Sequence, residues 1–231
     1  SALYSTKVLL NKKQKDDSLD VLFNKNEVSN KFFYVGFYIF IRSMFLTIFM
    51  AYLRNRASLM SMEEIALQHV LLQLWSFGYV FVDALAIAAQ TLVSEYKTKF
   101  HDYRNSDLKI YLNKLTLRIS ASLFVFSSIF LDTLITLITD KSLGQLIDFE
   151  LRILFGLSLL IGSFAFLWDG VLLGLDKSRE FSSLTVVASI IGFVSCSYLL
   201  NFENSLSSLW IGLNLSLVYR GIVGFLYQIR D

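Results

Sequence analysis

Six long apolar runs set what this sequence can fold into. They cover approximately residues 33–53, 65–92, 116–138, 152–175, 182–200 and 206–227, and polar connections separate them. Each run is close to the ~20 residues that a helix needs to cross the hydrocarbon core of a bilayer. The short alternating segments of a transmembrane barrel are absent. The sequence therefore predicts an all-α, polytopic transmembrane bundle with six spanning helices.

Composition excludes several other classes of protein. The chain is 55% hydrophobic and only 17% charged, whereas soluble domains carry about 25% charged residues. Cys196 is the single cysteine, so an internal disulfide is impossible, and its apolar surroundings predict a buried, inert thiol. The formal net charge of +2 is too small to indicate a nucleic-acid partner.

No catalytic or metal-binding pattern is visible. The sequence has no phosphate-binding glycine loop and no Ser/His/Asp arrangement, so it predicts neither an enzyme nor an ATP-driven pump. His69 and His101 are too far apart in the sequence to suggest a metal site. We expect no cofactor and no metal, and a lipid bilayer as the surrounding solvent.

The basic residues lie mostly on one side of the predicted bundle. They gather in residues 1–31, in the connection after the second run and in the connection after the fourth. The opposite side receives Arg54, Arg56, Lys141 and Arg152. The positive-inside rule then places both termini in the cytoplasm of a multi-pass protein, in a cell membrane or a plastid membrane. We interpret residues 1–31 as a polar linker or interfacial segment and residues 32–231 as the six-helix lobe. The chain begins with Ser1 and not with Met, so we expect that the natural N-terminus lies upstream.

Ionisable residues inside the apolar runs are the candidate functional residues. A charge at the bilayer centre costs about 2.5–3.5 kcal/mol, so it is kept where it faces a partner or a watery cavity. Arg42 lies mid-way along the first run, and Asp83 lies in the second. Gln90 follows Asp83 by two helical turns, on nearly the same face. We interpret these three as substrate or ion pathway residues; structural ion pairing is the alternative for Arg42 and Asp83.

A second group lies in the cytoplasmic half of the predicted bundle. Asp169 and Arg220 fall at a similar depth to Asp83, which predicts a charge network that holds helices together and gates the inner side. Gly170 and Gly174 form a small-xxx-small face that favours close helix packing. Asp132 lies near the outer end of the third run and is interpreted as an interfacial residue.

Several segments together resemble the MATE (multidrug and toxic compound extrusion) transporters, in their DinF-like branch. Residues 65–75 with 82–93 resemble the eighth helix of that family, 168–174 with 177–180 its tenth helix and inner loop, 209–221 its last helix, and 41–43 the arginine of its seventh. The resemblance runs in order over about residues 32–230. Two departures are Ser94-Glu95, where a glycine is common in the branch, and the order Leu67-Gln68-His69 in place of Ala-His-Gln.

This resemblance implies the C-terminal half of a larger transporter. MATE proteins have twelve helices in two six-helix lobes and export organic compounds in exchange for H⁺ or Na⁺. The implied partner is an N-terminal six-helix lobe, which carries an aspartate commonly implicated in cation coupling. The alternatives are a non-transporting six-helix membrane scaffold or assembly subunit, and a small carrier that works as a homodimer.

Overall fold

All regular secondary structure in the described chain is helical. The computed structural model describes residues 25–100, 107–139 and 141–230. Its helices are α2 (Lys25–Ala57), α3 (Met62–Phe100), α4 (Asp107–Ile138), the short α5 (Lys141–Gly144), α6 (Phe149–Gly174), α7 (Ser178–Phe202) and α8 (Leu206–Arg230). Six of them are long and apolar enough to cross a membrane, which confirms the predicted fold class.

The chain divides into two compact units, residues 1–40 and 41–231. The described part of the first unit is the N-terminal section of α2, on which Phe32, Phe33 and Phe37 are exposed. Residues 1–24 of the predicted polar segment lie outside the described residues, and 25–31 form the first turns of α2.

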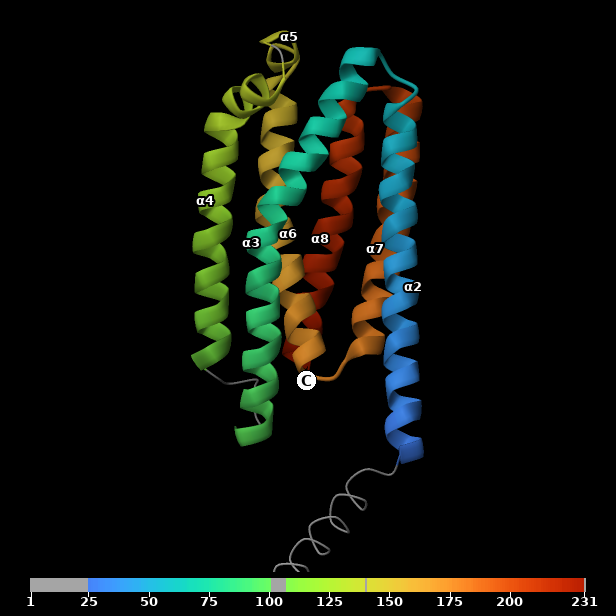
Figure 1. The fold of residues 1–231 in the computed structure, drawn as a ribbon, viewed down its shortest axis with the longest axis vertical. Coiled ribbons are helices and arrows are strands. Elements are labelled where there is room, and N and C mark those ends of the chain that lie inside the picture. The colour runs from blue at the N-terminus through green and yellow to red at the C-terminus, as the bar shows by residue number, and fades with distance from the viewer. Residues whose placement is uncertain (1–24, 101–106, 140, 231) are drawn as a thin grey trace, which may run out of the picture. The chain divides into compact units, whose positions relative to one another are not determined.

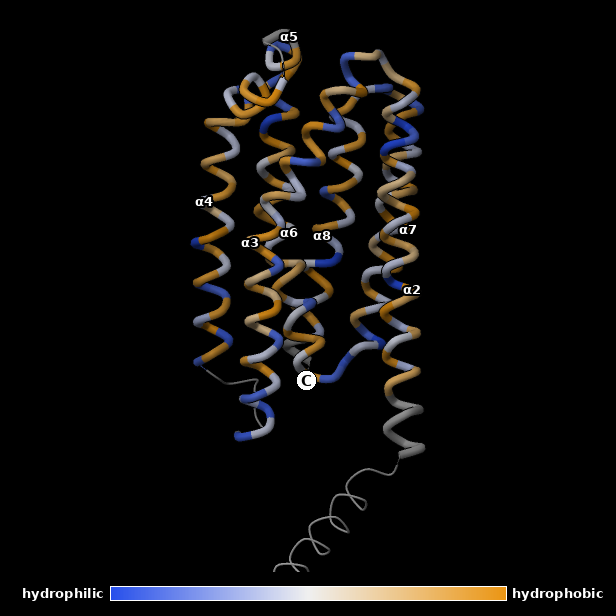
Figure 2. The backbone as a smooth tube through the Cα atoms, viewed as in Figure 1, coloured by the Kyte–Doolittle hydropathy of each residue, from blue (hydrophilic) through white to orange (hydrophobic). Residues whose placement is uncertain are grey.

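In the second unit, α6 is the central helix. It packs against α3, α4 and α8, and α7 packs against α8. Figure 1 shows the C-terminal ends of α3, α6 and α8 at one end of this bundle, together with the N-terminal ends of α4 and α7. Hydrophobic residues dominate the lengths of these helices, and hydrophilic residues lie at the ends and at a few places between them (Figure 2). This distribution suits helices whose outer faces contact lipid.

Local sequence signals mark the start of α3 and the end of α6. Ser61 and Glu64 form a capping box before α3, in which the Ser61 backbone N–H donates to Glu64 Oε2 at 3.0 Å and the Glu64 N–H donates to Ser61 Oγ at 3.3 Å. The turn after α6 places Asp176 at φ 64°, a left-handed conformation that Asp tolerates better than most residues. Beside it, burial lowers the pKa of Lys177, against the opposing effect of Glu180.

The last section of α2 in the second unit packs on α7. Tyr52 Oη and Ser197 Oγ are 2.7 Å apart, and the rings of Tyr52 and Phe193 are in tilted contact with centroids 4.2 Å apart. Cys196 on the same helix is buried, as predicted, and its thiol faces the Leu209 carbonyl of α8 at 3.6 Å. A buried sole cysteine also gives an assay: a thiol-reactive dye labels it only when the bundle opens.

We expect Gln68→Leu to destabilise the chain by about 1–3 kcal/mol, the usual cost of an unsatisfied buried polar group. Gln68 Oε1 accepts a hydrogen bond from Trp210 Nε1 at 2.9 Å, and both side chains are buried. The loss would be measured as earlier labelling of Cys196 on heating in detergent. Adding Trp210→Phe removes the orphaned donor, so the double variant should lose less than the sum of the two single changes. Strict additivity would contradict the hydrogen bond's role.

Candidate functional site

A buried ion pair joins α6 to α8. The Arg220 side chain on α8 donates from both Nε and Nη2 to the carboxylate of Asp169 on α6, with Nε 3.3 Å from Oδ1. Asp169 is 5% exposed and Arg220 is 3% exposed. Bidentate pairing of this kind is the strongest geometry for an arginine and a carboxylate. The pair satisfies two charges that would otherwise be too costly to keep in the bundle.

Arg42 on α2 makes this pair a three-residue cluster. Its Nη2 lies 3.9 Å from Asp169 Oδ2, and its guanidinium lies over the ring of Phe181 on α7, 4.3 Å from the centroid. Arg42 Nε is buried, and no hydrogen-bond partner for it is found among the residues that the structure describes. The Asp169 carboxylate therefore contacts two arginines, and side chains from α2, α6, α7 and α8 meet at this cluster.

Aromatic rings pack around the charge cluster. The Arg220 guanidinium lies 4.6 Å from the centroid of Phe166, and the Phe166 and Tyr79 rings are in tilted contact with centroids 4.7 Å apart. Tyr79 donates its hydroxyl proton to the Ser158 carbonyl at 3.1 Å. Sequence reasoning did not single out Tyr79, Phe166 and Phe181. Their spacing in the sequence could have indicated two of them: Tyr79 precedes Asp83 by one helical turn, and Phe166 precedes Asp169 by nearly one turn.

Asp83 and Gln90 lie on an exposed face of α3. In the described part of the chain, Asp83 forms no ion pair or hydrogen bond, although its carboxylate interacts electrostatically with both Arg42 and Arg220. The structure thus brings Arg42, and not Asp83, to the predicted pair of Asp169 and Arg220. Asp83 remains a nearby carboxylate on the exposed face of α3.

Close helix packing positions Asp169. A Cβ atom on Gly170 would collide with the backbone of Ala86 in α3, and one on Gly174 would come within 2.7 Å of the Gln90 carbonyl oxygen. The small-residue face predicted at these two glycines is therefore confirmed. It holds α6 against α3 directly beside the charge cluster.

Other candidate residues lie away from this cluster. Asp132 near the C-terminal end of α4 pairs with Arg152 in the first turns of α6. His69 is on α3, and His101 lies outside the described residues. Among the residues that the structure describes, no group of His, Cys, Asp and Glu is arranged to hold a metal ion.

Comparison with solved structures identifies the fold. A crystal structure of MATE in the bent conformation matches with TM-score 0.74 and 18% identity, over 87% of this chain and 45% of that chain. A crystal structure of a MATE point mutant matches with TM-score 0.69 and 18% identity, over 81% and 42%. The inward-facing conformation of a multidrug resistance MATE family transporter of the MOP superfamily gives TM-score 0.66 and 17% identity, over 81% and 44%. The chain has the fold of part of a MATE transporter.

At these identities the likeness is one of fold, and the chain spans less than half the length of each MATE structure that it matches. No protein-family model matches the sequence, and no curated protein matches it. Six apolar spanning helices in a MATE fold make this an integral, multi-pass membrane protein.

Proposed function

We propose that the chain is the C-terminal lobe of a DinF-like MATE transporter that exports organic compounds in exchange for H⁺ or Na⁺. The observation that carries this proposal is the fold match to MATE structures. A second six-helix lobe would complete the carrier, since the match covers less than half of each neighbour. Transport would proceed by alternating access, with the lobes rocking about a shared cavity.

The charge cluster supports a role in coupling. Asp169 already serves two arginines, Arg42 and Arg220, while Asp83 stays exposed nearby. Binding or release of a cation at Asp83 changes the charge that Arg42 faces, so the balance between Arg42–Asp169 and Arg42–Asp83 attraction shifts. Arg42, Asp83 and Gln90 would line the pathway, and Asp169 with Arg220 would hold the gate.

We expect Asp83→Asn and Arg42→Ala each to lower cation-coupled export by about tenfold, within the usual range of coupling free energies. The full-length protein is reconstituted in liposomes, an H⁺ or Na⁺ gradient is imposed, and ethidium movement is followed by fluorescence. Glu95→Gln is the control, since Glu95 is exposed and pairs with Lys99 on its own helix at 2.6 Å. Unchanged export in both pathway variants would remove these residues from the coupling mechanism.

The size of the native polypeptide separates this proposal from the homodimeric carrier and the scaffold. An immunoblot of the native membrane should detect a product about twice the length of the 231-residue sequence if both lobes share one chain. A product of the shorter size would favour a homodimer when detergent-purified protein is dimeric and moves ethidium. The shorter product would favour a scaffold when the protein co-purifies with a distinct partner and transports no ethidium.

A further inference from the structure

A long apolar groove lies between α3 and α4, over α6. Its volume is about 780 Å³, within the range of ordinary ligand sites. Leu74, Phe77 and Phe81 of α3 form one wall, Leu123, Phe126 and Leu134 of α4 form the other, and α6 provides Phe155 and Leu159 as the floor. The groove exists because α3 and α4 both pack on α6 and touch each other little.

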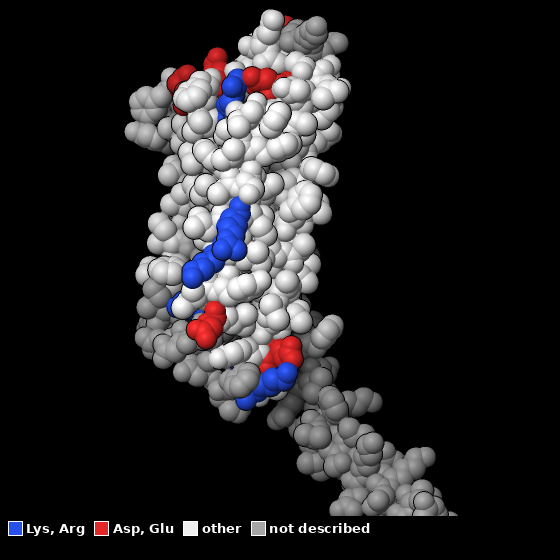
Figure 3. Space-filling view, turned by 90° about the vertical axis from the view of Figure 1, so that its left-hand side faces the viewer, with Lys and Arg blue, Asp and Glu red and all other residues white. Residues whose placement is uncertain are grey.

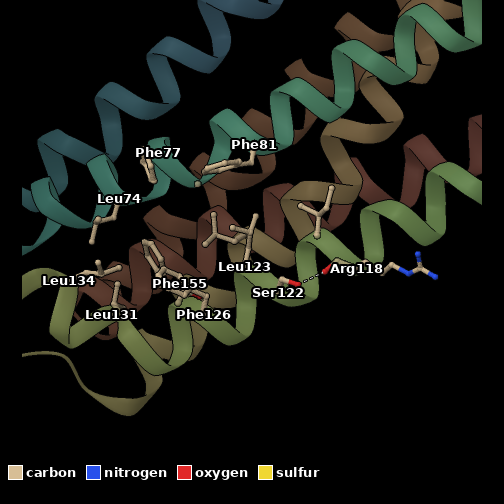
Figure 4. Close-up of a pocket in the computed structure, with 14 residues that line it drawn as sticks. Leu74, Phe77, Phe81, Arg118, Ser122, Leu123, Phe126, Leu131, Leu134 and Phe155 are labelled. Atoms are coloured by element: carbon tan, nitrogen blue, oxygen red, sulfur yellow. Dashed lines mark hydrogen bonds between the residues drawn. The ribbon is translucent and has the colours of Figure 1, made fainter.

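Arg118 is the single charged residue among those that line this groove. Its guanidinium extends from one end, away from Leu131 and Leu134 at the other end (Figure 4). It is exposed, and in the part of the chain that the structure describes its side chain has no ion-pair or hydrogen-bond partner. Lys114, one turn earlier on α4, is exposed as well. On the face shown in Figure 3, Lys or Arg side chains form one continuous run between the acidic side chains nearer the two ends.

The depth of Arg118 matches a lipid headgroup region. At 1.5 Å per residue, Arg118 lies about 30 Å from the C-terminal end of α4 at Ile138, which is the thickness of the hydrocarbon core. With Ile138 at one boundary of the core, Arg118 lies at the other. From Arg118 to Leu134 the groove runs for about 24 Å along α4, longer than the ~15 Å depth of one leaflet.

We propose that this groove binds an anionic phospholipid, with an acyl chain between α3 and α4 and the phosphate paired with Arg118. The lipid comes from the leaflet on the side of the α3–α4 connection. Charge complementarity selects the occupant: the groove wall is apolar, its one charge is an unpaired cation, and that cation stands at headgroup depth. An acyl chain fills the apolar length, and an anionic headgroup supplies the missing partner of Arg118.

Native mass spectrometry tests the binding. The full chain in detergent is mixed with equal amounts of phosphatidylglycerol and phosphatidylcholine that carry the same acyl chains. The wild type should retain phosphatidylglycerol preferentially. Arg118→Gln should lower this preference about fivefold, the ratio that corresponds to one basic residue near a membrane surface, and Arg118→Lys should keep most of it. Equal retention of the two lipids by the wild type, or an unchanged preference in Arg118→Gln, would overturn the proposal.

Two further variants locate the site. Ser122 lines the groove one turn after Arg118, so Ser122→Trp should fill the groove and lower the retention of both lipids. Arg179→Gln removes an exposed cation on α7 outside the groove and should change nothing. If Ser122→Trp retains as much lipid as the wild type, the lipid binds elsewhere and the proposal is wrong. The proposal is also wrong if Arg179→Gln lowers the preference for phosphatidylglycerol as much as Arg118→Gln does. Cys196 labelling on heating verifies that each variant is folded.

Discussion

Asp169→Leu should destabilise the bundle by about 3–5 kcal/mol, the usual cost of removing one partner from a buried ion pair. The reason is the geometry of the cluster: Asp169 is the carboxylate that both Arg220 and Arg42 contact. Without it, the bidentate partner of Arg220 disappears, and two guanidinium groups lose the carboxylate that they share in a largely buried place. We expect the midpoint of Cys196 labelling on heating to fall by about 10 °C.

A second substitution separates lost pairing from lost packing. Asp169→Leu combined with Arg220→Leu removes the whole bidentate pair and leaves Arg42 as the remaining cation of the cluster, and apolar replacements of whole buried pairs are often nearly neutral. The double variant should therefore recover much of the lost stability. Asp132→Asn is the matched control, because that carboxylate also pairs with an arginine, Arg152, but in a half-exposed place, where an ion pair contributes at most about 1 kcal/mol. Equal losses in Asp169→Leu and Asp132→Asn would show that burial does not decide the energetics of these pairs.

Most of the fold could be predicted from the sequence because bilayer thickness imposes a length on each spanning helix. The predicted run 152–175 became α6 (Phe149–Gly174), and 182–200 became α7 (Ser178–Phe202). The ends differ by several residues where polar turns continue a helix beyond its apolar part. The largest extension at one end is in α4, which begins at Asp107, before the predicted run 116–138, and the added residues are too polar for the apolar pattern to include.

The candidate site was harder to predict because its partners lie far apart in the sequence. Intramembrane charges identified Asp169 and Arg220 as network residues, since the bilayer makes unpaired charges costly. Which third residue joins them depends on the rotation of α2 and α3 about their axes. The sequence grouped Asp83 with the pair by depth alone, and the structure places Arg42 there. The groove at Arg118 was also not foreseen, because it arises from a space between two helices and not from a motif.

Gly170→Ala should destabilise the bundle by about 1–3 kcal/mol, the usual cost of overpacking. Helix propensity alone predicts the opposite, since alanine is favoured over glycine in a helix interior by about 1 kcal/mol. The added Cβ meets backbone and not a movable side chain: the Ala86 carbonyl carbon lies 2.9 Å from it and Ala86 Cα lies 3.1 Å from it. Helices α3 and α6 must therefore separate, and Asp169 moves with α6.

Gly221→Ala is the matched control for Gly170→Ala. Gly221 also lies inside a helix next to a residue of the charge cluster, Arg220, but a Cβ there would meet no atom of another described helix within 4 Å. Propensity should then dominate, and this variant should be neutral or more stable by up to about 1 kcal/mol. Opposite signs for the two substitutions, measured by Cys196 labelling on heating, would show that backbone contact between α3 and α6 sets the position of the ion cluster. If Gly170→Ala stabilised the bundle, α3 and α6 would have space for the added methyl group. Close packing of these two helices would then not determine the position of Asp169.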